Sequence, residues 1–129
     1  MRTPTVLVVD DDDSVREVTQ MALELVAKWR VLPATGGEAA IALAQEHRPD
    51  AVLLDLMMPV VDGRATFHAL RADERTRDIP VILLTAKLQV GETQAWDDLA
   101  VAGVISKPFS PMTLGAEVAA MLGWEDVGV

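Results

Sequence analysis

The chain has 129 residues, about the length of one domain, and its lack of cysteine excludes disulfide scaffolds, zinc–thiolate sites and thiol nucleophiles. Twenty acidic against eleven basic residues give a net charge of -9, which repels nucleic-acid phosphates. No apolar run approaches the roughly 20 residues of a membrane span, and the N-terminus lacks a charged leader before an apolar stretch. We therefore expect a cytoplasmic protein without membrane insertion or direct nucleic-acid contacts.

Three short apolar runs contain no polar residue: 6–9, 51–54 and 81–84. Such runs are typical of strands that are buried on both faces, as in a parallel sheet covered by helices. Two weaker strand candidates lie at 30–32 and 104–106.

Helical patterns separate these strands. The pair Ser14 and Glu17 forms a capping box, and Thr35 with Glu38 repeats it before a helix over 39–47. The first helix carries apolar residues at helical spacing: Val15, Val18, Ala22, Leu25 and Trp29. Three more helices are expected over about 62–70, 90–101 and 112–122, the last with Ser110 as N-cap and Pro111 at its first position.

Strands and helices thus alternate along the chain, which predicts an α/β fold, a doubly wound five-stranded parallel sheet. No repeat or Ser/Gly-rich linker divides the sequence. We expect a single domain over residues 1–129, with a core of about 4–122 and a loose tail at 123–129.

Polar residues occur where the predicted strands end. Asp10 and Asp11 follow the first strand, Asp55 the third, Thr85 the fourth and Lys107 the fifth. Ligands of doubly wound sheets bind outside the carboxyl ends of the strands, so these side chains should converge. Three crowded carboxylates repel one another without a cation, and their hard oxygen atoms suit Mg²⁺, with Mn²⁺ as a second possibility.

The other two strand-end residues suit a phosphoryl group. The ammonium group of Lys107 and the hydroxyl group of Thr85 can both bind phosphoryl oxygens. Together with a metal ion they neutralise a phosphoryl group in transfer, and the Asp55 carboxylate is a candidate nucleophile for an aspartyl-phosphate.

These motifs, in this order and spacing, resemble the response-regulator receiver domain of bacterial two-component signalling, specifically a stand-alone, chemotaxis-regulator-like one. The resemblance covers residues 4–122 and lies in four stretches: 6–12, 55–59 with Asp62-Gly63, 84–86 and 107–109. It implies the flavodoxin-like (βα)5 fold with strand order 2-1-3-4-5. It also implies a switch that a histidine kinase or phosphotransfer protein phosphorylates on Asp55.

The resemblance assigns further roles around Asp55. It implies that the acidic residues and one carbonyl group hold Mg²⁺, namely Asp11, Asp55 and the Met57 carbonyl directly and Asp10 through a water molecule. Thr85 would close on the phosphoryl group, Lys107 would pair with it, and the backbone of Met57 and Ala86 would contact it. The Lys107-Pro108 peptide would be cis.

Three positions depart from the family pattern. Val104 stands where receivers usually carry Tyr or Phe, and Ala100-Val101 stands where they usually have Gly-Ala. Trp96 occupies a position that is often small. One hypothesis is that Trp96 makes the transition of the missing ring; static packing is the favoured alternative.

The sequence thus predicts a phosphorylation-controlled switch that acts on an unknown downstream protein target and turns over no separate metabolite. An alternative is an aspartyl-phosphate phosphatase of the haloacid-dehalogenase type, but that family places a second aspartate where this chain has Met57. Another alternative is a degenerate receiver that docks without phosphorylation, for which the set Asp11, Asp55, Thr85 and Lys107 would be surplus.

Overall fold

The computed structural model describes residues 3–55, 63–85, 101–106 and 109–124. These residues contain one five-stranded sheet in the order β2-β1-β3-β4-β5, with every neighbouring pair parallel. The strands are β1 (Thr5–Val9), β2 (Arg30–Ala34), β3 (Ala51–Asp55), β4 (Val81–Thr85) and β5 (Gly103–Ser106). The doubly wound sheet and its strand order are confirmed.

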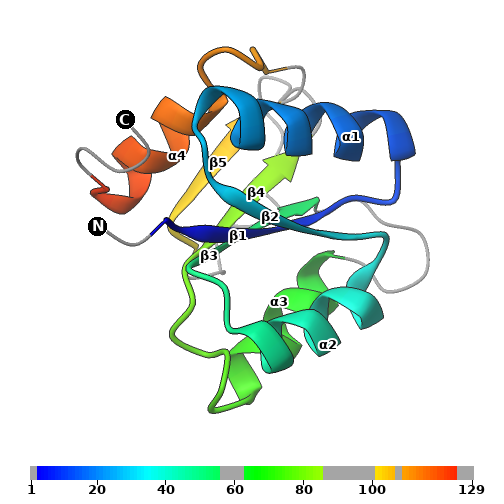
Figure 1. Cartoon of the computed structure of the whole chain (residues 1–129). Helices are drawn as coiled ribbons and strands as arrows, with labels where there is room; N and C mark the ends of the chain where they lie inside the picture. Colours follow the sequence, from blue (N-terminus) through cyan, green and yellow to red (C-terminus); the bar gives the residue numbers. More distant parts are fainter. Residues whose placement is uncertain (1–2, 56–62, 86–100, 107–108, 125–129) are drawn as a thin grey trace, which may run out of the picture.

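Helices cover both faces of the sheet (Figure 1). They are α1 (Asp13–Met21), continued by the π-helical turn η1 (Ala22–Val26), then α2 (Gly37–His47), α3 (Gly63–Ala72) and α4 (Leu114–Leu122). Figure 1 shows α1 and α4 on one face of the sheet and α2 and α3 on the other. The helix α4 is the fifth of the predicted helices, whereas nearly all of the fourth, 90–101, lies outside the described residues.

The core forms two layers because successive strand residues point to opposite faces. Leu7, Val9 and Leu54 pack beneath α2 and α3, whereas Val6, Val8 and Leu53 pack beneath α1, η1 and α4. All six are fully buried. Burying one such side chain contributes about 1.5–3 kcal/mol, which explains why unbroken apolar runs become central strands.

Three of the helices begin at residues other than those predicted from the sequence. The N-cap of α1 is Asp12, whose Oδ1 atom accepts hydrogen bonds from the Ser14 and Val15 amides at 2.9 and 3.2 Å. The N-cap of α2 is Gly36 rather than Thr35. The predicted helix from Met112 begins only at Leu114, after a turn in which the Thr113 and Leu114 amides bond to the Ser110 carbonyl oxygen.

The last part of the first predicted helix is not a regular α-helix but the π-helical turn η1. In η1 the Ala27 amide bonds to the Ala22 carbonyl oxygen, five residues back, and the Trp29 amide bonds to the Leu23 carbonyl oxygen at 3.0 Å. This wider turn rotates Leu25 out to 65% exposure and buries Leu23 instead. Of the apolar residues at helical spacing, Leu25 is therefore exposed, whereas Ala22 and Trp29 are buried.

Trp29 and the end of α4 close the second core layer. The Trp124 ring lies edge-to-face against Trp29, with ring centroids 5.3 Å apart. Gly123, at φ 71°, supplies the left-handed cap of α4 that brings Trp124 back onto the core. Trp124, which belongs to the predicted tail, is partly buried against this core layer, and residues 125–129 lie outside the described part.

Candidate functional site

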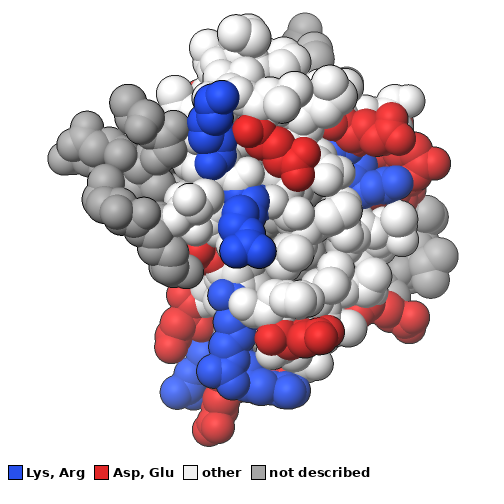
Figure 2. Space-filling model, in the orientation of Figure 1, with Lys and Arg blue, Asp and Glu red and all other residues white. Residues whose placement is uncertain are grey.

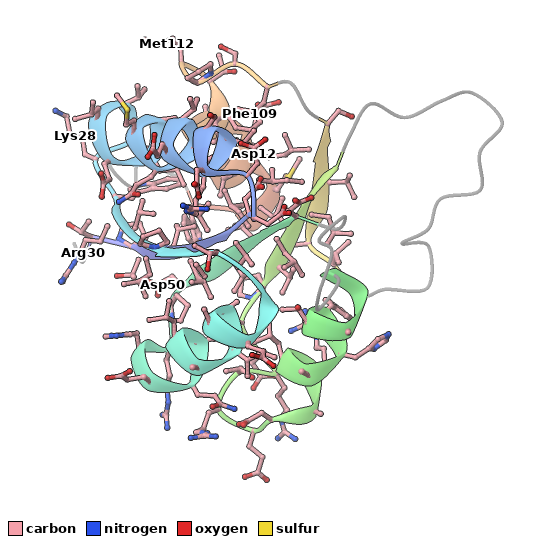
Figure 3. The ribbon with its side chains drawn as sticks, turned by 90° about the vertical axis from the view of Figure 1, so that its right-hand side faces the viewer. Asp12, Lys28, Arg30, Asp50, Phe109 and Met112 are labelled. Carbon is pink, nitrogen blue, oxygen red and sulfur yellow. The ribbon has the colours of Figure 1, made fainter. Side chains whose placement is uncertain are left out.

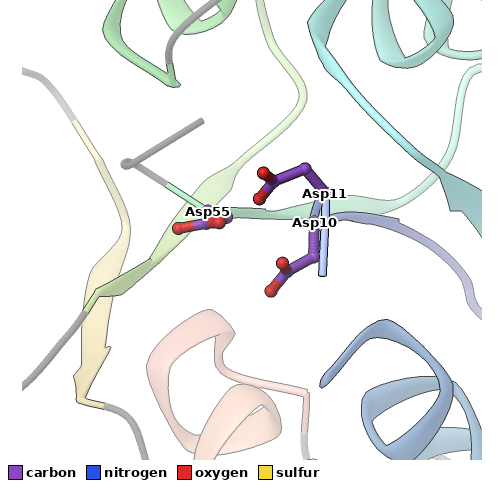
Figure 4. Close-up of side chains that lie close together, drawn as sticks. All are labelled: Asp10, Asp11 and Asp55. Atoms are coloured by element: carbon purple, nitrogen blue, oxygen red, sulfur yellow. The ribbon is translucent and has the colours of Figure 1, made fainter. Parts of the chain in front are cut away.

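The strands β1 and β3 are neighbours at the point where the strand order reverses, so their ends meet. Val9 pairs with Leu54 in the parallel register, which brings Asp10 and Asp11 beside Asp55 at the carboxyl edge of the sheet. One carboxylate oxygen from each aspartate lies within 4.8 Å of the other two (Figure 4). The predicted convergence of these three strand-end carboxylates is confirmed.

The three aspartates differ in burial. Asp10 is fully buried and Asp55 is 5% exposed, whereas Asp11 is exposed at the rim. At an effective dielectric constant near 20, the two buried carboxylates of Asp10 and Asp55 repel by about 3 kcal/mol, whereas pairs that include the exposed Asp11 are screened by water and repel less. The cluster is therefore costly with all three groups ionised, and a bound cation would relieve the repulsion.

The donor set fits a hard divalent cation. All three side chains offer carboxylate oxygens, which Mg²⁺ and Mn²⁺ prefer over nitrogen or sulfur ligands. The Oδ1 atom of Asp10 accepts a hydrogen bond from the Asp12 amide at 2.9 Å. This hydrogen bond helps to orient the Asp10 carboxylate at the edge of the sheet.

Backbone and side-chain contacts fix the turn that carries Asp10 and Asp11. The Asp10 amide donates to the Ala34 carbonyl oxygen of β2 at 3.2 Å. From the first turn of α1, the Nη1 atom of Arg16 donates to the Asp10 carbonyl oxygen at 2.9 Å, and its Nη2 atom pairs with the Asp13 carboxylate. The sequence analysis did not identify Arg16 as a residue of the site. The pattern that could have indicated it is an arginine one helical turn after the adjacent pair Asp12 and Asp13.

The remaining predicted site residues lie largely outside the described part of the chain. Thr85 is the last residue of β4 and follows Leu84, the register partner of Asp55, so its backbone lies at the same edge. Met57, Ala86 and Lys107, with the Lys107-Pro108 peptide, are outside the described residues. Trp96 and Ala100 are also outside them, whereas Val104 of β5 is partly buried and packs against the core layer beneath α2 and α3.

The sequence pattern of the response regulator receiver domain matches residues 6–119. The chain belongs to this family. Receiver domains are the phospho-accepting switches of two-component signalling, and this chain is one of them. The confirmed strand order and the three clustered aspartates agree with this membership.

A curated relative shows the same match within a longer protein. The receiver is 39% identical over 119 residues to the DNA-binding dual master transcriptional regulator RpaA of Synechocystis sp.. The match covers 92% of this chain but only 49% of RpaA, so the chain spans about half the length of the curated relatives it matches.

Two solved structures resemble the receiver over almost their whole length. The chemotaxis protein CheY4 of Vibrio cholerae is 30% identical, with a TM-score of 0.83 over 93% of this chain and 99% of CheY4. The receiver domain of the sensor histidine kinase PA1611 from Pseudomonas aeruginosa is 28% identical, with a TM-score of 0.83 over 95% and 99%. That structure has a magnesium ion coordinated in its active-site cleft. Among the described residues of the present receiver, no helix is long and apolar enough to cross a membrane.

Proposed function

We propose that Asp55 is the phospho-acceptor of this receiver and that a histidine kinase or a phosphotransfer protein is the donor. The position of Asp55 carries the proposal: it ends a fully buried strand, at the switch point of the sheet, within 4.8 Å of two further carboxylates. In the transfer, an Asp55 oxygen forms a bond to phosphorus while the bond from phosphorus to the donor histidine nitrogen breaks. The imidazole leaves with the electron pair and takes up a proton.

Asp10, Asp11 and Asp55, with the Met57 carbonyl group, would hold Mg²⁺, or Mn²⁺ in its place. Their oxygen donors and the magnesium ion in the PA1611 receiver support this assignment. When bound, the metal ion supplies positive charge that offsets both the carboxylates and the phosphoryl oxygens. The aspartates orient that charge from a turn and a strand end that the fold holds side by side.

Thr85, Ala86 and Lys107 would complete the phosphoryl site. Thr85 closes β4, which neighbours β3, and Ala86 follows it directly. Lys107 follows Ser106, the last residue of β5, which pairs with Thr85. The Thr85 hydroxyl, the Lys107 ammonium and the backbone amides of Met57 and Ala86 would each bind a phosphoryl oxygen.

The same pocket would later hydrolyse its own aspartyl-phosphate, so the domain assists its own phosphorylation and dephosphorylation without turning over a separate substrate. The phosphorylated and free states would differ in affinity for a downstream protein target. The net charge of -9 supports a protein rather than a nucleic acid as the target of this domain. We place the domain over residues 1–129, with a core of about 4–122, and we propose that it acts in the cytoplasm. On the face in Figure 2, basic side chains are interspersed with acidic ones.

The test is phosphorylation by a small donor. Incubation of the full chain with acetyl phosphate and Mg²⁺ should add one phosphoryl group, measured by intact mass, and Asp55→Asn should add none. Asp50→Asn is a matched control, because Asp50 precedes the same strand at its opposite end and should leave incorporation unchanged. Undiminished incorporation in Asp55→Asn would refute the acceptor, and a wild-type chain that takes up no phosphoryl group would favour the degenerate receiver.

A further inference from the structure

One peptide group joins two of the three clustered aspartates. The carbonyl group of Asp10 belongs to the planar peptide that links Asp10 to Asp11, so holding this unit restricts the backbone from which both side chains project. Its oxygen accepts the 2.9 Å hydrogen bond from the Nη1 atom of Arg16. The Arg16 contact therefore acts on both aspartates at once.

Arg16 is itself held in place. Its side chain is only 13% exposed, and its Nη2 atom pairs with the Asp13 carboxylate, which is 80% exposed. A guanidinium group is planar and presents its donors in a fixed fork, so one group can bridge the Asp10 carbonyl oxygen and the Asp13 carboxylate. The fork thus spans the turn between β1 and α1 from one end to the other.

The turn has two further anchors. The Asp10 amide is bonded to Ala34 of β2, and the Asp10 carboxylate is bonded to the Asp12 amide. These contacts hold the nitrogen and the side chain of Asp10, and the contact from Arg16 holds its carbonyl group. Because Asp11 lies exposed at the rim, the direction of its side chain depends on the peptide that precedes it.

We propose that Arg16 is a positioning residue for the cation site: it holds the Asp10–Asp11 peptide so that both carboxylates face Asp55. This inference rests on the proposed metal-dependent function. A purely electrostatic role predicts the opposite result. A positive charge beside an anionic cluster opposes cation binding, so its removal would tighten Mg²⁺ binding, whereas loss of the anchor weakens it.

The experiment is a calorimetric Mg²⁺ titration of the full chain, with far-UV circular dichroism to confirm the fold of each variant. Arg16→Ala should weaken Mg²⁺ binding about ten-fold, the lower end of the loss seen when a partner of a metal ligand is removed. Arg16→Lys keeps the charge and one donor but not the fork, so its affinity should lie between those of Arg16→Ala and the wild type.

Two control variants separate position from charge. Arg30→Ala removes the same charge from an exposed arginine at the amino end of β2 (Figure 3) and should leave Mg²⁺ affinity unchanged. Asp13→Asn removes the charge partner of Arg16 but leaves the Asp10 carbonyl oxygen available, so it should bind almost as well as the wild type. A loss in Asp13→Asn equal to that in Arg16→Ala would assign the effect to the ion pair and overturn the role of the carbonyl contact.

Binding by folded Arg16→Ala that is as tight as the wild type, or tighter, overturns the inference. If Arg16→Ala does not fold, Arg16→Lys decides: weaker binding than wild type supports the positioning role, and equal or tighter binding overturns it. A wild-type chain that binds no Mg²⁺ refutes the proposed metal site itself, which is a different outcome from wild-type binding that no Arg16 variant alters.

Discussion

Aspartates at the two ends of the sheet have different surroundings. At the amino end, Asp50 precedes β3 and exchanges two hydrogen bonds with Thr5: its Oδ2 atom accepts from the Thr5 amide at 2.8 Å, and its own amide donates to the Thr5 carbonyl oxygen at 2.7 Å. Asp50 (labelled in Figure 3) thus lies beside the start of β1, at the opposite end of β3 from Asp55. At the carboxyl end, Asp10, Asp11 and Asp55 crowd together.

The difference separates an aspartate that stabilises the fold from aspartates that prepare a site. Asp50 receives a backbone proton donor that ties β1 to the start of β3. The carboxylates of Asp10, Asp11 and Asp55 lie within 4.8 Å of one another, so their mutual repulsion favours the binding of a cation. Unfavourable interactions of this kind occur at functional sites, where the binding of a ligand offsets the repulsion.

The largest expected effect is stabilisation by the cation. Mg²⁺ at 100 times its dissociation constant should raise the free energy of unfolding by about 2.7 kcal/mol, because it binds the folded state and not the unfolded chain. Asp11→Ala should lose most of this gain at the same Mg²⁺ concentration, whereas Asp50→Asn should keep it. Thermal unfolding with Mg²⁺ and with EDTA measures the stabilisation of each variant. If Mg²⁺ stabilised Asp11→Ala as much as the wild type, the carboxyl end would not be the cation site that distinguishes it from the amino end.

The next effect lies at the amino end. Asp50→Ala should lower the free energy of unfolding by about 1.5 kcal/mol, because the partly buried Thr5 amide loses a charged acceptor. Asp50→Asn retains an acceptor oxygen and should recover most of that loss. Urea unfolding in EDTA measures the difference, and equal stability of Asp50→Ala and wild type would show that this contact does not support the fold.

The comparison also shows what the sequence alone could predict. The unbroken apolar strands and the polar residues at their ends are local patterns, and parallel strands put equivalent ends at one edge, so the convergence of Asp10, Asp11 and Asp55 was predictable. The strand order came from the family resemblance. The roles of Met57, Ala86 and Lys107 remain predictions, because these residues lie outside the described part of the chain.

The contacts of individual side chains and the local geometry of the first helix could not be predicted from these sequence patterns. Four consecutive aspartates offer several N-caps, and only the fold shows that Asp12 reaches the free amides of α1. Apolar spacing predicts that a helix forms but not how it is wound, and here the π-helical turn leaves Leu25 exposed and buries Leu23. The Arg16 contact depends on a long side chain folding back along its own helix, for which spacing gives only a weak signal.

A smaller effect of opposite sign is expected at the carboxyl end without metal. Asp11→Ala should raise the free energy of unfolding in EDTA by about 0.5 kcal/mol, the scale of an exposed charge pair, because it removes one of three mutually repelling carboxylates. In urea unfolding, the free energy of unfolding should therefore be higher for Asp11→Ala than for the wild type and lower for Asp50→Ala. An Asp11→Ala variant less stable than wild type in EDTA would contradict the crowded-carboxylate account.

The smallest effect concerns Asp73, which lies between α3 and β4 and, like Asp50, receives its partners from the protein. Its carboxylate accepts hydrogen bonds from the Arg75 side chain at 2.9 and 3.1 Å, from the Arg75 amide at 2.8 Å and from Gln45 of α2 at 2.9 Å. The Arg75 side-chain hydrogen bonds are the main cause that lowers the pKa of Asp73 from 3.8 to about 2, with the Arg75 amide next. The folded state therefore favours the ionised carboxylate.

A lowered pKa gives a stabilising contribution that is present above the unfolded pKa, near 4, and is lost as the pH falls through the folded pKa near 2. The wild type should thus unfold at a higher temperature than Asp73→Asn at pH 5, and the gap should narrow steadily towards pH 2. Arg75→Ala is the matched control, because it leaves the carboxylate but should bring its pKa back towards the ordinary value. Circular-dichroism melts of the three proteins across this range measure the effect, and a gap that stays constant from pH 5 to pH 2 would show that the hydrogen bonds to Asp73 do not favour its ionised form.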